Sequence, residues 1–399
     1  MPKLFKNIYF CSTMISFENT EIAFKGKSNK DLKRAYWLFK LVSNPKLVSF
    51  GKVFTTAALK FNFPIKGIIK KTIFKQFCGG ETIAECRETT EVLGEFGIGT
   101  ILDYSVEGKT SVEDFDATVL EIIQTIEEGS SNPKIPFAVF KVTGIARFGI
   151  LEKANDGIDH LSEIERKELD DVILRINKIC SNAFEKEQPV FIDAEETWIQ
   201  NTIDFIATEM MKKYNKSKAI VFNTAQMYRH DRLEYIKKEI ELAKKESYFY
   251  GIKLVRGAYM EKERERASIK NYPSPIQKDK ASSDNDFNLA LDFITDNIEI
   301  VSLCAGTHNE KSSLYLSELM EKKKISKNNS HIYFAQLLGM SDHISYNLAH
   351  ATYNVAKYVP YGPINEVLPY LLRRADENTS VAGQTGRELG LIMKERKRR

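Results

Sequence analysis

Short apolar segments alternate with longer segments of helical periodicity over most of the chain. The apolar segments, which we predict to be β-strands, are ILDYSVE (101–107), FAVFKVTG (137–144), PVFIDAE (189–195), AIVFNTAQ (219–226), GIKLVRGAY (251–259), VSLCAGTH (301–308), IYFAQLLG (332–339) and NVAKYVPYG (354–362). Strands that alternate with helices indicate parallel βαβ units. Eight such units favour an α/β fold of the closed (β/α)8, TIM-like barrel type over an open sheet.

Helical spacing fills the intervals between these strands and also precedes the first one. The predicted barrel helices are 112–128, 161–186, 197–213, 230–246, 286–298, 310–323 and 363–378. The connection 260–285 is charged and contains two prolines, so we expect a lid or an unstructured excursion there. The chain is predicted to hold a basic helical N-terminal region over 1–98, a barrel over 99–380 and a basic tail over 381–399.

Composition indicates a soluble globular protein with 43% hydrophobic and 28% charged residues. No apolar run approaches the roughly 18 residues that span a bilayer. The five cysteines form no CxxC pair, so we expect reduced thiols in a cytoplasmic compartment. We find no zinc-ligand spacing and predict no metal site. The dinucleotide, phosphate-loop, HExxH and GxSxG motifs are absent from the sequence.

Charge is distributed unevenly along the chain. Residues 1–76 carry 15 Lys and Arg against 3 Asp and Glu, whereas the remainder carries 43 against 51. One explanation is a solvated basic helical face, and the other is peripheral contact with an anionic inner-membrane surface. We expect no nucleic-acid binding, because the basic region lacks interleaved aromatic residues on a recognisable recognition fold.

Polar residues stand at the ends of several predicted strands, where barrel enzymes place their chemistry. These residues are Glu107, Asp193, Gln226, Thr307 and His308. Lys141 also interrupts an apolar strand, and a lysine is costly there unless an anion accompanies it. A purely structural pair of Lys141 with Asp193 would explain those two residues. Five polar strand ends in one barrel favour a functional site instead.

Two further segments bring cations to the predicted barrel mouth. In YLLRRADEN, Tyr370, Arg373 or Arg374, and Glu377 lie near one helix face. Arginine forks suit a carboxylate ligand, although surface pairing with Asp376 or Glu377 is the common alternative. In KLVRGAY, Lys253 and Arg256 precede Gly257, where a backbone could approach a ligand closely. This arrangement suggests an anionic ligand such as a phosphate, with a Schiff-base lysine as the competing interpretation.

The segments FIDAEET, KLVRGAYMEKERERA, GTHNE, FAQLLGMSDHIS and YGPINEVLPYLLRRADENTS resemble the proline dehydrogenase family. They occur in the family's order across roughly residues 100–380. The resemblance implies a distorted (β/α)8 barrel that holds FAD without a covalent bond. It further implies oxidation of L-proline to Δ1-pyrroline-5-carboxylate by hydride transfer to the flavin, the first step of proline catabolism to glutamate.

The resemblance also implies roles for individual residues. For the substrate, Lys141, Arg373 and Arg374 hold the carboxylate, Tyr358 and Tyr370 pack over the ring, and Tyr259, Ala258 and Leu254 form further pocket wall. Contacts to the flavin fall on Gln226, Lys253, Arg256, Gly257, Ala258, Thr307, His308 and Glu377. Asp193 supports the flavin and a pocket tyrosine, and Glu107 is the acidic partner of Arg373.

Two positions depart from the family pattern. Lys253 stands where some bacterial members have an arginine, and Met260 replaces a tryptophan that stacks on adenine in some members. The expected electron acceptor is a membrane quinone. A separate pyrroline-5-carboxylate dehydrogenase is expected to take the product, since too few residues follow the barrel for a second enzyme module.

Other functions remain open at this point. A Schiff-base aldolase would use Lys141 or Lys253 and would be colourless. A hydroxyproline dehydrogenase would share the whole site, and a folate-reducing flavin barrel would not need the double-arginine helix. A non-catalytic membrane-binding scaffold would explain the basic arm but not the polar strand ends.

Overall fold

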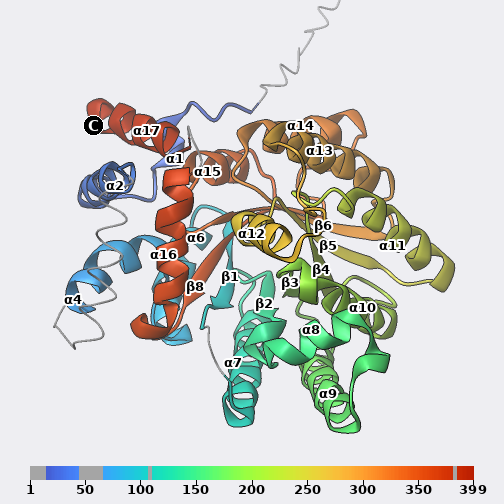
Figure 1. Cartoon of the computed structure of the whole chain (residues 1–399). Coiled ribbons are helices and arrows are strands. Elements are labelled where there is room, and N and C mark those ends of the chain that lie inside the picture. The colour runs from blue at the N-terminus through green and yellow to red at the C-terminus, as the bar shows by residue number, and fades with distance from the viewer. Residues whose placement is uncertain (1–14, 45–65, 107–109, 381–383) are drawn as a thin grey trace, which may run out of the picture.

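Eight parallel strands close into a barrel in sequence order, which confirms the predicted fold (Figure 1). The structure is a computed structural model that describes residues 15–44, 66–106, 110–380 and 384–399, with the backbone alone at 66, 375–380 and 384–385. The strands are β1 (Ile98–Tyr104), β2 (Phe137–Lys141), β3 (Val190–Asp193), β4 (Val221–Gln226), β5 (Tyr250–Val255), β6 (Val301–Gly306), β7 (Ile332–Leu337) and β8 (Val355–Tyr361). The seam between β1 and β8 is paired from Ile98–Val355 through Tyr104–Tyr361.

The predicted barrel helices are all present, and the structure adds others. The predicted set is α7 (Val112–Ser131), α9 (Glu163–Glu185), α10 (Thr197–Tyr214), α11 (Arg232–Glu246), α13 (Lys280–Asp296), α14 (Glu310–Lys322) and α16 (Ile364–Ser380). The additional helices in the barrel are α8 (Phe148–Asp156), α12 (Met260–Lys270) and α15 (Asp342–His350), with short 3-10 turns at Val142–Gly144 and Ile158–His160.

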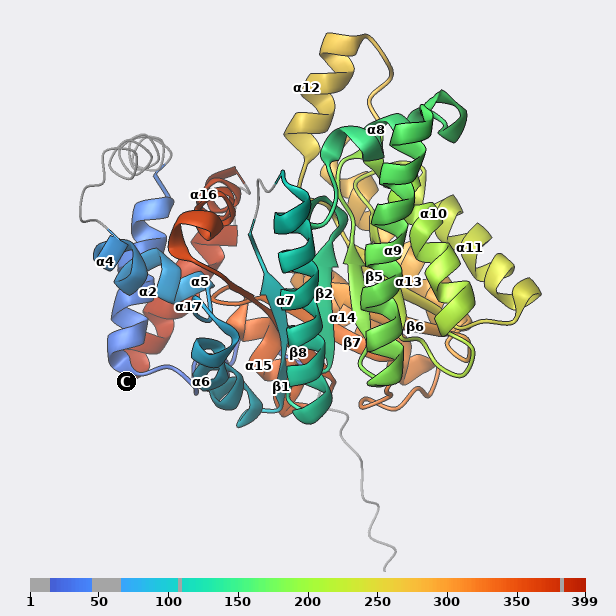
Figure 2. The ribbon, with the colours of Figure 1, turned by 90° about the horizontal axis from the view of Figure 1, so that it is seen from below.

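Of the two alternatives for 260–285, a lid or an unstructured excursion, the unstructured excursion was wrong. Helix α12 occupies its first half and projects from one end of the barrel (Figure 2). Glu263 is buried and accepts hydrogen bonds from the backbone and hydroxyl of Thr197, at 2.7 and 2.6 Å. The Arg266 guanidinium lies 4.3 Å from the ring of Trp198. These contacts with α10 hold a helix whose own sequence is almost entirely polar.

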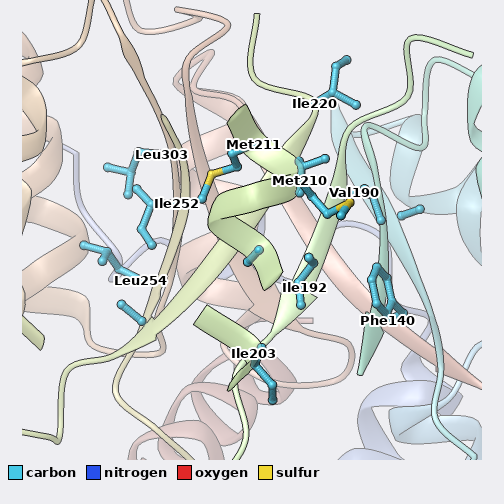
Figure 3. Packing of buried hydrophobic residues seen from close by; sticks show 14 of the residues in the cluster. Phe140, Val190, Ile192, Ile203, Met210, Met211, Ile220, Ile252, Leu254 and Leu303 are labelled. Atoms are coloured by element: carbon cyan, nitrogen blue, oxygen red, sulfur yellow. The ribbon is translucent and has the colours of Figure 1, made fainter. Parts of the chain in front are cut away.

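Alternate residues of each strand face the barrel lumen and the surrounding helices. Phe137, Phe191 and Phe222 fill the lumen, and the rings of Phe137 and Phe191 are stacked with centroids 4.4 Å apart. Their neighbours Val190 and Ile192 point outward and belong to the cluster that includes Met210 and Met211 of α10 (Figure 3). The lumen is therefore packed below the strand ends, which leaves the mouth as the place for a ligand.

Helices outside the barrel cover one of its sides. They are α1 (Thr20–Ala23), α2 (Asn29–Val42), α4 (Lys66–Ile69), the π-helical turn η1 (Lys70–Phe74), α5 (Lys75–Phe77), α6 (Ile83–Gly94) and α17 (Gln384–Arg398). Helix α17 lies beside α2 (Figures 1 and 2), where Leu391 and Ile392 pack against Leu32, Ala35 and Phe39.

The segment from α4 to α5 packs against helix α16. Phe74 and Phe77 belong to one buried cluster with Val367 and Leu371 of α16 and with Met340. Among the helices of the described residues, none combines the length and apolarity that a bilayer crossing requires.

Candidate active site

The centre of the barrel mouth is a buried ion pair across the lumen. The Lys253 ammonium of β5 contacts the Asp193 carboxylate of β3 and the Tyr358 hydroxyl of β8. The Tyr358 hydroxyl and Asp193 Oδ1 are 3.5 Å apart, and the ammonium lies 4.6 Å from the Tyr358 ring centroid. The negative partner of Lys253 is thus a carboxylate of the chain itself, whereas the pattern alone suggested a phosphate.

Two acids that are not among the predicted site residues face Lys141. Asp103 of β1 is buried, which raises the pKa of its carboxyl, while Lys141 and the Ser105 hydroxyl at 2.6 Å oppose that rise. Burial likewise raises the pKa of Glu195 to about 7, opposed by Lys141 and by hydrogen bonds from Thr143. The sequence offered a signal for Glu195, because it follows Asp193 by two positions within the predicted strand 189–195, where the period of two would place both on one face.

Tyr259 lies within electrostatic range of both Lys141 and Arg373 of the double-arginine helix. Burial raises the pKa of the Tyr259 phenol, and the positive charges of Lys141 and Arg373 partly offset this effect. The Arg374 guanidinium lies 5.2 Å from the ring of Tyr370. Lys141 and Arg373 therefore both lie within electrostatic range of one tyrosine. Glu107 and the side chain of Glu377 lie outside the described residues.

Arg256 forms a second polar group next to this centre. It donates to Asp284 at 2.6 Å, to the Thr307 hydroxyl at 2.5 Å and to the Ser312 hydroxyl at 2.9 Å. Burial lowers the pKa of Arg256, and Asp284 opposes that change. The guanidinium is fixed by three partners, so its orientation is set before any ligand arrives.

Gln226, Gly257 and Ala258 lie beside Arg256. Gln226 donates to the backbone oxygen of Glu195 at 2.6 Å and lies 3.4 Å from the Ala258 amide nitrogen. Gly257 has φ +124°, and a Cβ there would come within 2.1 Å of the Tyr228 ring. Packing against Tyr228 is therefore one reason for a glycine at this position.

His308 completes the polar strand ends. Burial and the positive charges of Lys357 and Arg374 lower the pKa of His308 to about 3, so the imidazole is neutral at physiological pH. Its Nδ1 is 2.9 Å from the Ser341 hydroxyl. A buried arginine, a neutral imidazole, a threonine and an amide side chain at neighbouring strand ends offer hydrogen-bonding groups that fit a polar ligand such as a dinucleotide. Among the described residues, no group of three or more His, Cys, Asp or Glu could hold a metal ion.

The chain is similar to known proteins over most of its length. The family model described as "Proline dehydrogenase" matches residues 86–387. "Proline dehydrogenase 1, mitochondrial" of Dictyostelium discoideum is 34% identical over 379 residues, covering 84% of this chain and 66% of the relative. The Caenorhabditis elegans protein of the same name is 36% identical over 338 residues, covering 82% and 54%. The chain thus spans about two thirds and about half of these two relatives.

Two other comparisons broaden this finding. "Hydroxyproline dehydrogenase" of Xenopus laevis is 29% identical over 419 residues, covering 94% of this chain and 88% of that protein. The solved structure of proline utilization A from Bdellovibrio bacteriovorus matches with a TM-score of 0.72 at 20% identity, covering 93% of this chain and 40% of that one. This likeness supports the barrel fold.

The raised pKa of Glu195 predicts a pH-dependent stability. Between the ordinary value of 4.5 and about 7, the carboxyl ionises when the chain unfolds but stays protonated in the fold. The unfolded state is thereby favoured as pH rises, and this group should cost about 2–3 kcal/mol of stability between about pH 5 and about pH 8. Glu195→Gln should remove that dependence in urea unfolding measured across this range. The exposed Glu185→Gln should keep the wild-type profile, and a Glu195→Gln profile equal to wild type would contradict the assignment.

Proposed function

The chain belongs to the proline dehydrogenase family, and from this premise we propose that it oxidises L-proline to Δ1-pyrroline-5-carboxylate with non-covalently bound FAD. The observation that carries the proposal is the approach of Lys141 and Arg373 to Tyr259, next to the Lys253–Asp193 pair. A small amino acid with a free carboxylate matches the two cations. The apolar and aromatic surroundings match its saturated ring.

In this proposal, the chain's own residues bind and orient the substrate. Lys141, Arg373 and Arg374 hold the carboxylate by charge-assisted hydrogen bonds. Tyr358 and Tyr370 restrict the ring, and holding it in one orientation is the main contribution the protein makes to the rate. The amine must be neutral when C5 loses hydride, because its lone pair forms the new C=N bond.

The cofactor would lie against the ends of β4 to β6. FAD supplies the hydride acceptor when bound, and the protein sets its orientation and electrostatics. Gln226, Lys253, Arg256, Thr307 and His308 would hold it, together with Gly257 and Ala258 of the same turn and with Glu377. Lys253 would act as a point charge rather than a fork.

A Schiff-base aldolase is a weaker candidate for this site. Its nucleophile must be a neutral amine. The Lys253 side chain is buried, and its Nζ is already engaged by the Asp193 carboxylate and the Tyr358 hydroxyl. This pairing favours an electrostatic role for Lys253 over a nucleophilic one.

The proposed function predicts a flavoprotein that proline reduces. Purified protein, or protein reconstituted with FAD, should show oxidised-flavin absorption that bleaches when L-proline is added under anaerobic conditions. Heat should release FAD, since no covalent bond is expected. An absorption spectrum decides the matter: protein that stays colourless after incubation with FAD, or a flavin spectrum that proline does not change, would refute the proposal.

Hydroxyproline is the alternative substrate, and Tyr358 is the residue that should discriminate against it. The Tyr358 ring is stacked parallel to Phe191 with centroids 6.4 Å apart, and its hydroxyl is held by Lys253. A tyrosine fixed in this way should crowd a ring hydroxyl, so we expect proline to have the higher kcat/KM. Tyr358→Ser should narrow this preference by about tenfold, equivalent to about 1.4 kcal/mol.

Tyr358→Phe is the matched control for this substitution, because it keeps the ring and removes only the hydroxyl. It should retain the preference for proline in steady-state assays with both substrates. Equal turnover of proline and hydroxyproline by the unmodified enzyme would show that Tyr358 does not select the substrate.

We further propose that a membrane quinone accepts the electrons and that a separate dehydrogenase takes the product. The outer face of α2 supports contact with a membrane, because Trp37 and Leu41 are about half exposed there beside exposed Lys33 and Lys40. Basic and aromatic side chains together suit an anionic lipid surface. The relatives from Dictyostelium discoideum and Caenorhabditis elegans are named as mitochondrial, whereas our expectation for this chain is the cytoplasmic side of an inner membrane.

Binding of the basic region to lipid should depend on charge and salt. Sedimentation with anionic vesicles should exceed sedimentation with neutral ones and should weaken as salt rises, because screening acts within about 10 Å at 0.1 M. Trp37→Ala combined with Lys33→Ala and Lys40→Ala should reduce binding without loss of proline-dependent flavin reduction in solution. Equal sedimentation with both vesicle types would exclude this contact.

A further inference from the structure

The turn between β7 and α15 is held by residues from three distant parts of the chain. The Gly339 oxygen accepts a hydrogen bond from Gln76 of α5 at 2.9 Å. The Met340 oxygen accepts one from Lys357 of β8 at 2.8 Å. The Ser341 amide donates to the Glu388 carboxylate of α17. Two of these three contacts come from helices outside the barrel.

Ser341 has a backbone conformation that serine rarely adopts. Its φ is +51° and its ψ is +40°, the left-handed region. This conformation is unfavourable for a non-glycine residue and is kept where surrounding contacts enforce it. Ser341 precedes α15, yet its side chain does not cap that helix. The hydroxyl instead contacts Nδ1 of His308 at 2.9 Å.

Glu388 is the contact that fixes this conformation from outside the barrel. Its side chain is buried, and its carboxylate meets the Ser341 amide and lies 3.9 Å from Nδ1 of His343. Burial raises the pKa of the Glu388 carboxyl, and the charges of His343, Asp342 and Lys357 also act on that pKa. Removal of the carboxylate would leave the Ser341 amide without this partner and would free the residue to leave the left-handed region.

Because His308 is neutral, its contact with the Ser341 hydroxyl affects which of its ring nitrogens carries the proton. A neutral imidazole carries one N–H, and its position is set by the hydrogen bond at the other nitrogen. When the Ser341 hydroxyl donates to Nδ1, the proton stays on Nε2, which can then donate to a ligand. The orientation and tautomer of His308 therefore depend on where Ser341 is held.

We propose that Glu388 of α17 is a positioning residue for the cofactor site, acting through Ser341 on His308. The inference rests on the proposed function, since His308 is one of the residues expected to contact the flavin. It assigns helix α17, which is outside the barrel and follows all its strands in sequence, a part in binding the cofactor.

The chain offers a matched control on the same helix. Glu395 is also a fully buried glutamate of α17, but it pairs with Arg398 and Arg399, at 2.8 and 2.7 Å. Glu395→Ala should weaken the packing of α17 and lower the melting temperature. It should leave FAD affinity unchanged, because none of its described contacts reaches the turn at Ser341.

FAD titrations followed by flavin fluorescence should separate the two glutamates. Glu388→Ala should weaken FAD binding by about tenfold or more, as expected for a lost hydrogen bond to a charged group. Glu388→Gln keeps an acceptor oxygen and should recover much of this loss. Ser341→Gly suits the left-handed backbone and removes the hydroxymethyl group that contacts His308, so it should reproduce the defect of Glu388→Ala. Equal loss of FAD affinity in Glu388→Ala and Glu395→Ala would overturn the proposal.

A second measurement does not require the cofactor. In protein with 15N-labelled histidine and without FAD, the His308 side chain should show one neutral tautomer. A mixture should appear in Glu388→Ala and Ser341→Gly but not in Glu395→Ala. Unchanged His308 signals in Glu388→Ala would refute the positioning role. Wild-type protein that does not bind FAD would refute the proposed cofactor, whereas a His308 change confined to these two variants would still support the positioning role.

Discussion

A buried ammonium group needs an anion or a carbonyl oxygen beside it, because water no longer compensates its charge. Lysines lie on β2, β5 and β8 of this barrel, and each meets that need through another part of the chain. Lys253 reaches Asp193 across the lumen, and Lys357 reaches Asp342 at 2.8 Å on the outer side. The polar interactions of the mouth therefore connect different elements, and they exist only in the closed barrel.

The lysines on the two sides of the barrel wall have partners of different kinds. Inside, the acids around Lys141 leave a centre where positive and negative groups face one space. On the outer side, Lys357 of β8 contacts the β7–α15 turn, which residues of α5 and α17 also contact. Because β8 carries Tyr358 inward and Lys357 outward, one strand joins the substrate side to the surrounding helices. A change in the helices outside the barrel can thus alter the positions of residues at the mouth while the packing of the lumen stays the same.

The sequence predicted the barrel well, because short apolar runs recurred eight times with stretches of helical spacing between most of them. It predicted the polar strand ends for the same reason, since strand ends in such a barrel meet at one mouth. It did not predict the partner of Asp193, because three lysines on separate strands were available. Helix α12 was missed since its sequence lacks an apolar face, and its order comes from contacts with Thr197 and Trp198. The tail was predicted only as basic, because Leu391 and Ile392 find their apolar partners far away, in α2.

The packing of α17 on α2 sets an order of events during folding. Arg399 donates to the backbone oxygen of Lys27, 372 positions earlier in the chain. Contacts so far apart form late, because closing a long loop costs entropy before the contact repays it. The apolar face of α2 is synthesised early and stays uncovered until the strands, α16 and α17 have all emerged from the ribosome. Exposed surface of this kind aggregates and binds chaperones. The yield of folded protein should therefore be sensitive to chaperone supply during synthesis.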